Sequence, residues 1–189
     1  MKMRTPAAMI FSLWLAVHGR AHESPIDHVE RELEFSVKDG QLLLDYRLRF
    51  SDRALLMQVG EMDTNGDGRL SEQETAAYFT AQAAKLAELL KLQIDGHPLA
   101  LKPTGAARPD IKLTQAYQFC APLTGLRAGR HAGLFVDGHS RMYPGGYRWR
   151  QNADADVKQT RVVPLTEPDP KTTQHPEWLE LKFEIIVPE

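Results

Sequence analysis

The chain has 189 residues, of which 42% are hydrophobic and 25% are charged. These values are those of an ordinary globular protein, and they exclude a disordered, collagen-like or polytopic membrane protein. The formal net charge of −2 and the isoelectric point near 6.4 give no general attraction to nucleic acid or anionic lipid. We therefore expect no nucleic-acid partner.

The start of the chain has the layout of a secretory signal peptide. Lys2 and Arg4 precede an uncharged apolar run at residues 7–17, and a small residue stands at Ala21. The run is 11 residues long, well short of the ~20 that a membrane-spanning helix needs, and no later stretch approaches that length. The sequence predicts a signal peptide over residues 1–21 and no transmembrane segment after it.

Cleavage after Ala21 would release a mature protein of residues 22–189, either periplasmic or secreted. It would remove Lys2, Arg4 and Arg20 but no acidic residue, so the net charge would change from −2 to −5. We see no second domain boundary in the mature chain, and we expect it to form one domain.

Residues 30–50 are expected to form a β-hairpin. Apolar and polar side chains alternate on both sides of the turn sequence Lys38-Asp39-Gly40-Gln41. Closing the chain at this turn sets apolar residues opposite apolar ones and glutamates opposite arginines. The predicted pairs are Val37 with Leu42, Phe35 with Leu44, Leu33 with Tyr46, Glu32 with Arg47 and Glu30 with Arg49.

The spacing of apolar residues then changes from the strand period to the helix period. One helix, capped by Ser51, is predicted to run through about Met62, and a second from about Glu72 to Leu92. The pattern afterwards returns to short strands separated by turns, so a helical insertion at about 51–92 interrupts a mainly β chain of the α+β class. The later strands are predicted at 92–95, 99–101, 111–120, 131–136, 147–164 and 179–187.

Between the two helices, residues 63–74 match the EF-hand calcium loop, which has twelve positions. Oxygen donors stand at positions 1, 3, 5, 9 and 12, and Gly68 at position 6 allows the sharp backbone turn. Position 7 supplies its backbone carbonyl, so an arginine side chain there can point to water. The predicted ligands are Asp63, Asn65, Asp67, the carbonyl of Arg69, Ser71 and Glu74.

Six or seven oxygens suit Ca²⁺ at about 2.3–2.6 Å, whereas Mg²⁺ prefers a tighter octahedron. Ser71 and Glu74 also form a capping-box pattern, so the residues that close the loop would begin the second helix. Sensor EF-hands usually occur in pairs, and the sequence contains one such loop. This favours a structural calcium ion, although a regulatory one remains open.

Several features occur in a fixed order along the chain. They are Ala21-His22 after the signal, the strand end YRLRF at 46–50, the loop at 63–74, the turn LQIDGHP at 92–98 and the segment YPGGYRW at 143–149. In this order they resemble the exported N-terminal domain of bacterial nickel/cobalt transport proteins. The resemblance implies a β-sandwich-like domain with a helical insertion, and we expect an immunoglobulin-like β-sandwich.

Members of that family continue into membrane helices, which this sequence does not. The resemblance therefore implies an accessory role in metal handling and not transport.

A second hypothesis concerns His22, which cleavage after Ala21 would make the N-terminal residue. Its amine and imidazole together could chelate nickel, cobalt or copper, as in a transition-metal binding protein or chaperone. The later histidines show no ligand spacing, and we expect them at the surface or in turns. They are His97, His131, His139 and His175.

The sequence carries no motif of a serine hydrolase, a P-loop nucleotide-binding protein or a zinc protease. We therefore do not predict an enzyme. A site assembled across strands would leave no local motif, so catalysis stays an open alternative.

Overall fold

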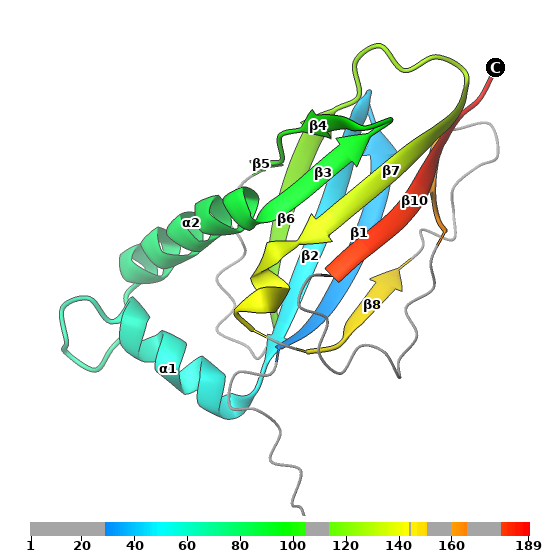
Figure 1. The fold of residues 1–189 in the computed structure, drawn as a ribbon. Helices are drawn as coiled ribbons and strands as arrows, with labels where there is room; N and C mark the ends of the chain where they lie inside the picture. Colours follow the sequence, from blue (N-terminus) through cyan, green and yellow to red (C-terminus); the bar gives the residue numbers. More distant parts are fainter. Residues whose placement is uncertain (1–28, 105–113, 144, 151–159, 166–178) are drawn as a thin grey trace, which may run out of the picture.

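The computed structural model describes residues 29–104, 114–143, 145–150, 160–165 and 179–189 (Figure 1). Within these residues the fold is mainly β, with two five-stranded sheets and two α-helices. The predicted signal peptide and His22 lie outside the described residues.

The first sheet has the strand order β5-β6-β2-β1-β8. Its pairs are antiparallel except for β1 with β8, which run parallel at one edge. Its strands are β1 (Val29–Lys38), β2 (Gln41–Phe50), β5 (Lys102–Pro103), β6 (Thr114–Pro122) and β8 (Tyr147–Arg150).

The second sheet has the order β4-β3-β7-β10-β9, and its pairs are antiparallel. The single strand predicted over 147–164 is wrong, because its two ends pair with different sheets: β8 with β1, and β9 with β10. The strands of this sheet are β3 (Leu90–Ile94), β4 (His97–Leu99), β7 (Gly129–Asp137), β9 (Arg161–Pro164) and β10 (Leu179–Val187).

The predicted register of the first hairpin is confirmed at every pair, including Glu32 opposite Arg47 and Glu30 opposite Arg49. Asp39 and Gly40 form the two-residue turn, with φ of 51° and 70°. Positive φ at both positions matches the twist of the flanking strands, and Asp-Gly adopts it at low cost. Turn chemistry and side-chain alternation therefore select the same register.

The helical insertion comprises α1 (Asp52–Met62) and α2 (Glu72–Leu89). Ser51 caps α1 by accepting a hydrogen bond from the backbone N–H of Ala54 at 3.2 Å. The predicted second helix was too long, because β3 begins at Leu90. Leu90, Leu92 and Ile94 alternate with exposed or half-buried residues and are all buried, so strand pairing with β7 overrides helix propensity there.

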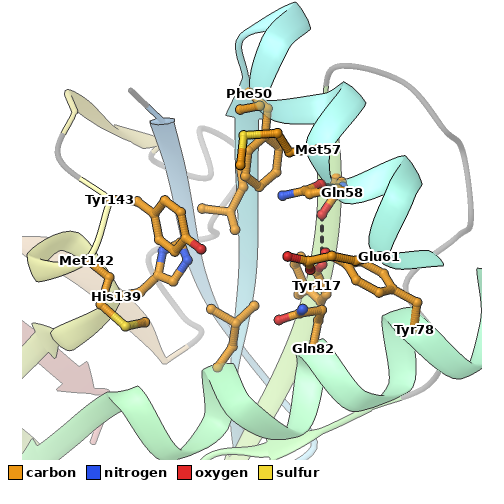
Figure 2. A pocket seen from close by; sticks show the side chains of 14 residues that line it. Phe50, Met57, Gln58, Glu61, Tyr78, Gln82, Tyr117, His139, Met142 and Tyr143 are labelled. Carbon is orange, nitrogen blue, oxygen red and sulfur yellow. Dashed lines mark hydrogen bonds between the residues drawn. The ribbon is translucent and has the colours of Figure 1, made fainter. Parts of the chain in front are cut away.

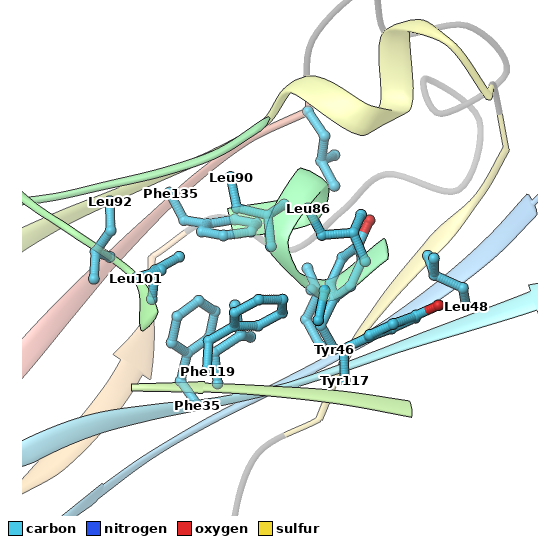
Figure 3. Packing of buried hydrophobic residues seen from close by; sticks show 14 of the residues in the cluster. Phe35, Tyr46, Leu48, Leu86, Leu90, Leu92, Leu101, Tyr117, Phe119 and Phe135 are labelled. Carbon is cyan, nitrogen blue, oxygen red and sulfur yellow. The ribbon is translucent and has the colours of Figure 1, made fainter. Parts of the chain in front are cut away.

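Side chains of both sheets and of α2 meet in one hydrophobic core (Figure 3). The ring of Phe35 on β1 lies 5.4 Å from that of Phe135 on β7 and 5.3 Å from that of Phe183 on β10. A side chain at position 133 on β7 would overlap the Phe183 ring, so this position needs glycine. From α2, the buried side chains of Phe79 and Leu86 fix the helix to the core.

The helix pair lies at one end of the sheets, where β2 runs into α1 and α2 runs into β3 (Figure 1). In the described part of the chain, neither helix is long and apolar enough to cross a membrane.

Candidate functional site

The loop at residues 63–74 joins the end of α1 to the start of α2, as an EF-hand requires. Met62, the last residue of α1, is fully buried. Leu70, at loop position 8, is half-buried and packs against the core, as its apolar character predicts. The loop is therefore anchored at both of these points, and its polar part faces solvent.

Asp63, at position 1, accepts three hydrogen bonds from loop amides. Its Oδ1 accepts from Gly66 N at 2.8 Å and from Asp67 N at 3.2 Å, and its Oδ2 accepts from Gly68 N at 2.8 Å. The backbone of the loop thus curls around this carboxylate.

The side chains at positions 3 and 5 each accept one hydrogen bond from a loop amide two residues further along. Asn65 Oδ1 accepts from Asp67 N, and Asp67 Oδ1 accepts from Arg69 N, both at 2.8 Å. Gly66 and Gly68 have φ of 72° and 75°, which glycine adopts readily and other residues rarely do. Alternate side chains therefore turn back onto the loop backbone.

Glu74, at position 12, closes the loop onto its beginning. Its Oε1 accepts from the N–H and the hydroxyl of Thr64, both at 3.0 Å. Its Oε2 accepts from the hydroxyl of Ser71 at 2.7 Å and from Ser71 N at 3.1 Å, which confirms the predicted capping box. Hydrogen bonds from Ser71 and then from Thr64 and Asn65 lower the pKa of Glu74 to about 2.

The donor set fits a hard cation in chemical type, because carboxylate, amide, hydroxyl and carbonyl oxygens are what Ca²⁺ prefers. Within the described residues, however, no three His, Cys, Asp or Glu side chains gather as a metal-binding group. The two oxygens of Glu74 are already held by Thr64 and Ser71. A bound ion would therefore have to replace hydrogen bonds of Glu74 with coordination.

A cluster of buried polar side chains lies near the end of the sheets where the helix pair lies. We call it the buried cluster, and its members are Arg31, Tyr46, Asp137, His139 and Ser140. Arg31 Nε lies 3.0 Å from Asp137 Oδ2, within ion-pairing distance but without the alignment of a hydrogen bond. Tyr46 donates its hydroxyl to the same oxygen at 2.8 Å. Both side chains of the ion pair are almost fully buried.

The other oxygen of Asp137 begins the short 3₁₀ helix η1 (Gly138–Arg141). It accepts from His139 N at 2.8 Å and from Ser140 N at 3.2 Å. Arg31 also donates to the carbonyl of Val29 at 2.8 Å and to that of Tyr143. One ion pair therefore ties β1, β2 and β7 to the segment that follows η1.

The sequence predicts His139 at the surface or in a turn; in the structure it lies in the short 3₁₀ helix η1 and is buried, so the surface position is wrong. Burial, and after it the charge of Arg31, lower the pKa of His139 to about 3, so its imidazole is neutral. Its Nδ1 lies 3.3 Å from Arg31 Nη2 and therefore accepts the hydrogen bond. The centroid of its ring lies 4.8 Å from that of Tyr143, and the two ring planes are tilted by 31°.

A cavity of about 360 Å³ separates the helix pair from η1 (Figure 2), and we call it the helix-pair cavity. His139, Met142 and Tyr143 line one side and residues of α1 and α2 the other. Within the lining, Gln115 Nε2 donates to Gln58 Oε1 at 2.6 Å, and Tyr117 donates to Gln115 Oε1 at 2.8 Å.

The buried cluster was not predicted from the sequence. Arg31 nevertheless left one signal, because it occupies a core-facing position in the alternation of β1, between Val29 and Leu33. An arginine on an apolar strand face needs a buried acidic partner. That partner, Asp137, stands 106 positions later, and local spacing could not identify it.

Comparison with protein-family models, with curated proteins and with solved structures gave no match for this chain. The resemblance to the exported domain of nickel/cobalt transport proteins therefore stays a prediction, as does chelation by His22.

Proposed function

We propose that this chain is an exported calcium-binding protein, periplasmic or secreted, in which one EF-hand at residues 63–74 binds one Ca²⁺. The ion would stabilise a helix pair inserted in an immunoglobulin-like β-sandwich. The contacts of Phe35 with Phe135 and Phe183 across the two sheets support the sandwich architecture. In this proposal the module serves interaction or accessory purposes and has no catalytic role.

The proposal rests above all on the closure of the loop, in which Glu74 at position 12 reaches Thr64 at position 2. This closure brings Glu74, the last acidic residue of the loop, close to the first residues of the loop, as an EF-hand requires. The left-handed glycines at positions 4 and 6 add to this support.

The ligands in this proposal are the side chains of Asp63, Asn65, Asp67, Ser71 and Glu74 and the carbonyl of Arg69. When bound, Ca²⁺ supplies positive charge to a loop in which three of the proposed ligands are carboxylates. The chain would contribute the rigid glycine turns that present these oxygens and the two helices that hold the ends of the loop.

A structural role for the ion is favoured by how the flanking helices pack. Met62 at the end of α1 and Phe79 on α2 are fully buried. A sensor helix pair opens to expose a groove on binding, and such an opening would expose these side chains. We therefore infer that calcium fixes the existing arrangement.

Thermal unfolding with and without calcium tests the proposal. Binding at ten times the dissociation constant adds about 1.4 kcal/mol, which corresponds to a rise in Tm of roughly 3–6 °C for a chain of this size. Asp63→Asn should remove this rise because it deletes one ligand charge.

Asp39→Asn is the matched control, because Asp39 is an exposed acid in the turn between β1 and β2, outside the loop. This variant should retain the full calcium response. An unfolding midpoint that does not move with calcium, or that moves equally in both variants, would contradict the proposal.

A further inference from the structure

The helix-pair cavity has the size and construction of a small-molecule site. Its volume of about 360 Å³ falls in the range of roughly 300–1,000 Å³ that ligand pockets occupy. Its walls come from α1, α2, β2, β6 and η1, so most of them belong to rigid elements. Met57, Met142 and Tyr143 at the cavity are 59%, 55% and 38% exposed, which shows that the cavity opens to solvent.

Aromatic rings form much of the lining. Tyr78 of α2, Tyr117 of β6 and Phe50 of β2 lie across the cavity from Tyr143 and His139 (Figure 2). The face of an aromatic ring carries negative partial charge and attracts cations. Several rings around one space therefore favour a cationic ligand.

The charged side chains around the cavity also favour a cationic ligand. Glu61 of α1 contributes a carboxylate, and the described lining includes no lysine or arginine. His139 is neutral, since its pKa is lowered to about 3 by burial. Arg31 donates a hydrogen bond to His139, and its positive charge is balanced by the ion pair with Asp137. The cavity therefore holds one negative charge that no cation of its lining balances.

The tyrosine hydroxyls stay neutral beside this carboxylate. Burial, and after it the charge of Glu61, raise the pKa of Tyr78 to about 12. Burial likewise raises the pKa of Tyr117. These hydroxyls therefore carry no charge at neutral pH. They can donate hydrogen bonds to a ligand or accept hydrogen bonds from it.

The remaining lining suits alkyl groups better than a bare metal ion. Glu61 is the one carboxylate among the described lining residues, whereas a metal ion takes several such ligands. The apolar side chains of Leu48, Phe50, Met57 and Met142 instead offer surface for methyl or methylene groups. From this combination we propose that the helix-pair cavity binds an organic ammonium ion that carries alkyl substituents.

Choline is a suitable probe, and 3,3-dimethylbutan-1-ol is its neutral analogue of the same shape. Titrations followed by NMR should be made on the full mature chain after removal of metal with EDTA, so that metal binding by the loop at residues 63–74 does not contribute. We expect choline to shift resonances of the cavity residues and to bind at least about tenfold more tightly than the neutral analogue. Equal affinity for both, or no shift at ~50 mM choline, would overturn the proposal.

Two variants locate the site. Glu61→Gln should weaken choline binding about threefold, as expected for a partly exposed charge pair, and Tyr143→Leu about fivefold. Both side chains are exposed, so the fold should be retained. Glu88→Gln on α2 is the control, because this exposed acid lies outside the cavity lining and its loss should not change binding. Equal weakening by Glu61→Gln and Glu88→Gln would show general charge attraction and would contradict the assignment.

Discussion

The loop at residues 63–74 and the buried cluster use polar groups in opposite ways. In the loop, the residue Asp63 is partly exposed, and its carboxylate accepts from amides three to five residues along the chain. In the buried cluster, the carboxylate of Asp137 is fully buried and meets Arg31 and Tyr46, both about a hundred residues away.

This difference determines what each region contributes. The solvated loop loses little when one hydrogen bond is removed, and its acids remain able to take up a cation. The buried ion pair has no water to replace a lost partner, so the removal of one member leaves an uncompensated charge. The cluster therefore fixes β1, β2 and β7, whereas the loop has the solvated acids that the proposed calcium site requires.

The largest expected effect comes from the cluster. Arg31→Met should lower the free energy of unfolding by about 3–5 kcal/mol, because it leaves Asp137 buried without its counter-ion. Urea denaturation measures this change. The double variant Arg31→Met with Asp137→Asn should recover part of the loss, since the amide oxygen still accepts from His139 N and carries no charge.

Arg47→Ala is the matched comparison on the surface. Arg47 pairs with Asp45 at 2.9 Å, and both side chains are partly exposed. Its loss should cost less than about 1 kcal/mol. If Arg31→Met cost no more than Arg47→Ala, the distinction between the two kinds of polar group would be wrong.

Acid should destabilise the cluster through His139. Its pKa is about 3 in the folded chain against the ordinary 6.5, so its stabilising contribution is complete above pH 6.5 and is lost as the pH falls toward 3. Between pH 7 and pH 4 this one group should remove about 3 kcal/mol from the free energy of unfolding.

His139→Asn separates this effect from the titration of surface acids. The asparagine oxygen can accept from Arg31 in place of Nδ1 and does not titrate. Urea denaturation at pH 7 and pH 4 should show a smaller acid loss in this variant than in the natural chain. The same loss in both would mean that His139 does not cause it.

A smaller effect is expected in the loop, where Ser71 and Glu74 combine two roles. Ser71→Ala should cost about 1 kcal/mol in metal-free protein, because it removes the cap of α2. Glu74→Gln should change metal-free stability little, since glutamine also serves in a capping box, but it should weaken calcium binding. Urea denaturation in chelator and in calcium distinguishes the two. A Glu74→Gln chain with the natural calcium response would exclude Glu74 as a ligand.

The sequence predicted what depends on neighbours along the chain. The register of β1 with β2 followed from alternation and from the Asp39-Gly40 turn, and the start of α2 followed from Ser71 and Glu74. The EF-hand pattern at residues 63–74 could be recognised because an EF-hand takes its ligands from one short segment, and calcium binding there stays a prediction.

What depends on distant parts of the chain was not predictable. The end of α2 moved from Leu92 to Leu89 because pairing with β7 stabilises Leu90 as a strand residue. The parallel pairing of β8 with β1 joins segments more than a hundred residues apart. His139 is buried because Arg31 and Tyr143 meet it from elsewhere in the chain, and no local pattern records that contact.

The central claim is that residues 63–74 bind one calcium ion, and calorimetric titration of chelator-stripped protein tests it most directly. We expect heat that fits about one site per chain, with a dissociation constant on the order of 10⁻⁴–10⁻³ M, as in extracellular calcium modules. The Asp63→Asn chain should give far less heat under the same conditions. An absence of heat from the natural chain at ~10 mM Ca²⁺ would contradict the account.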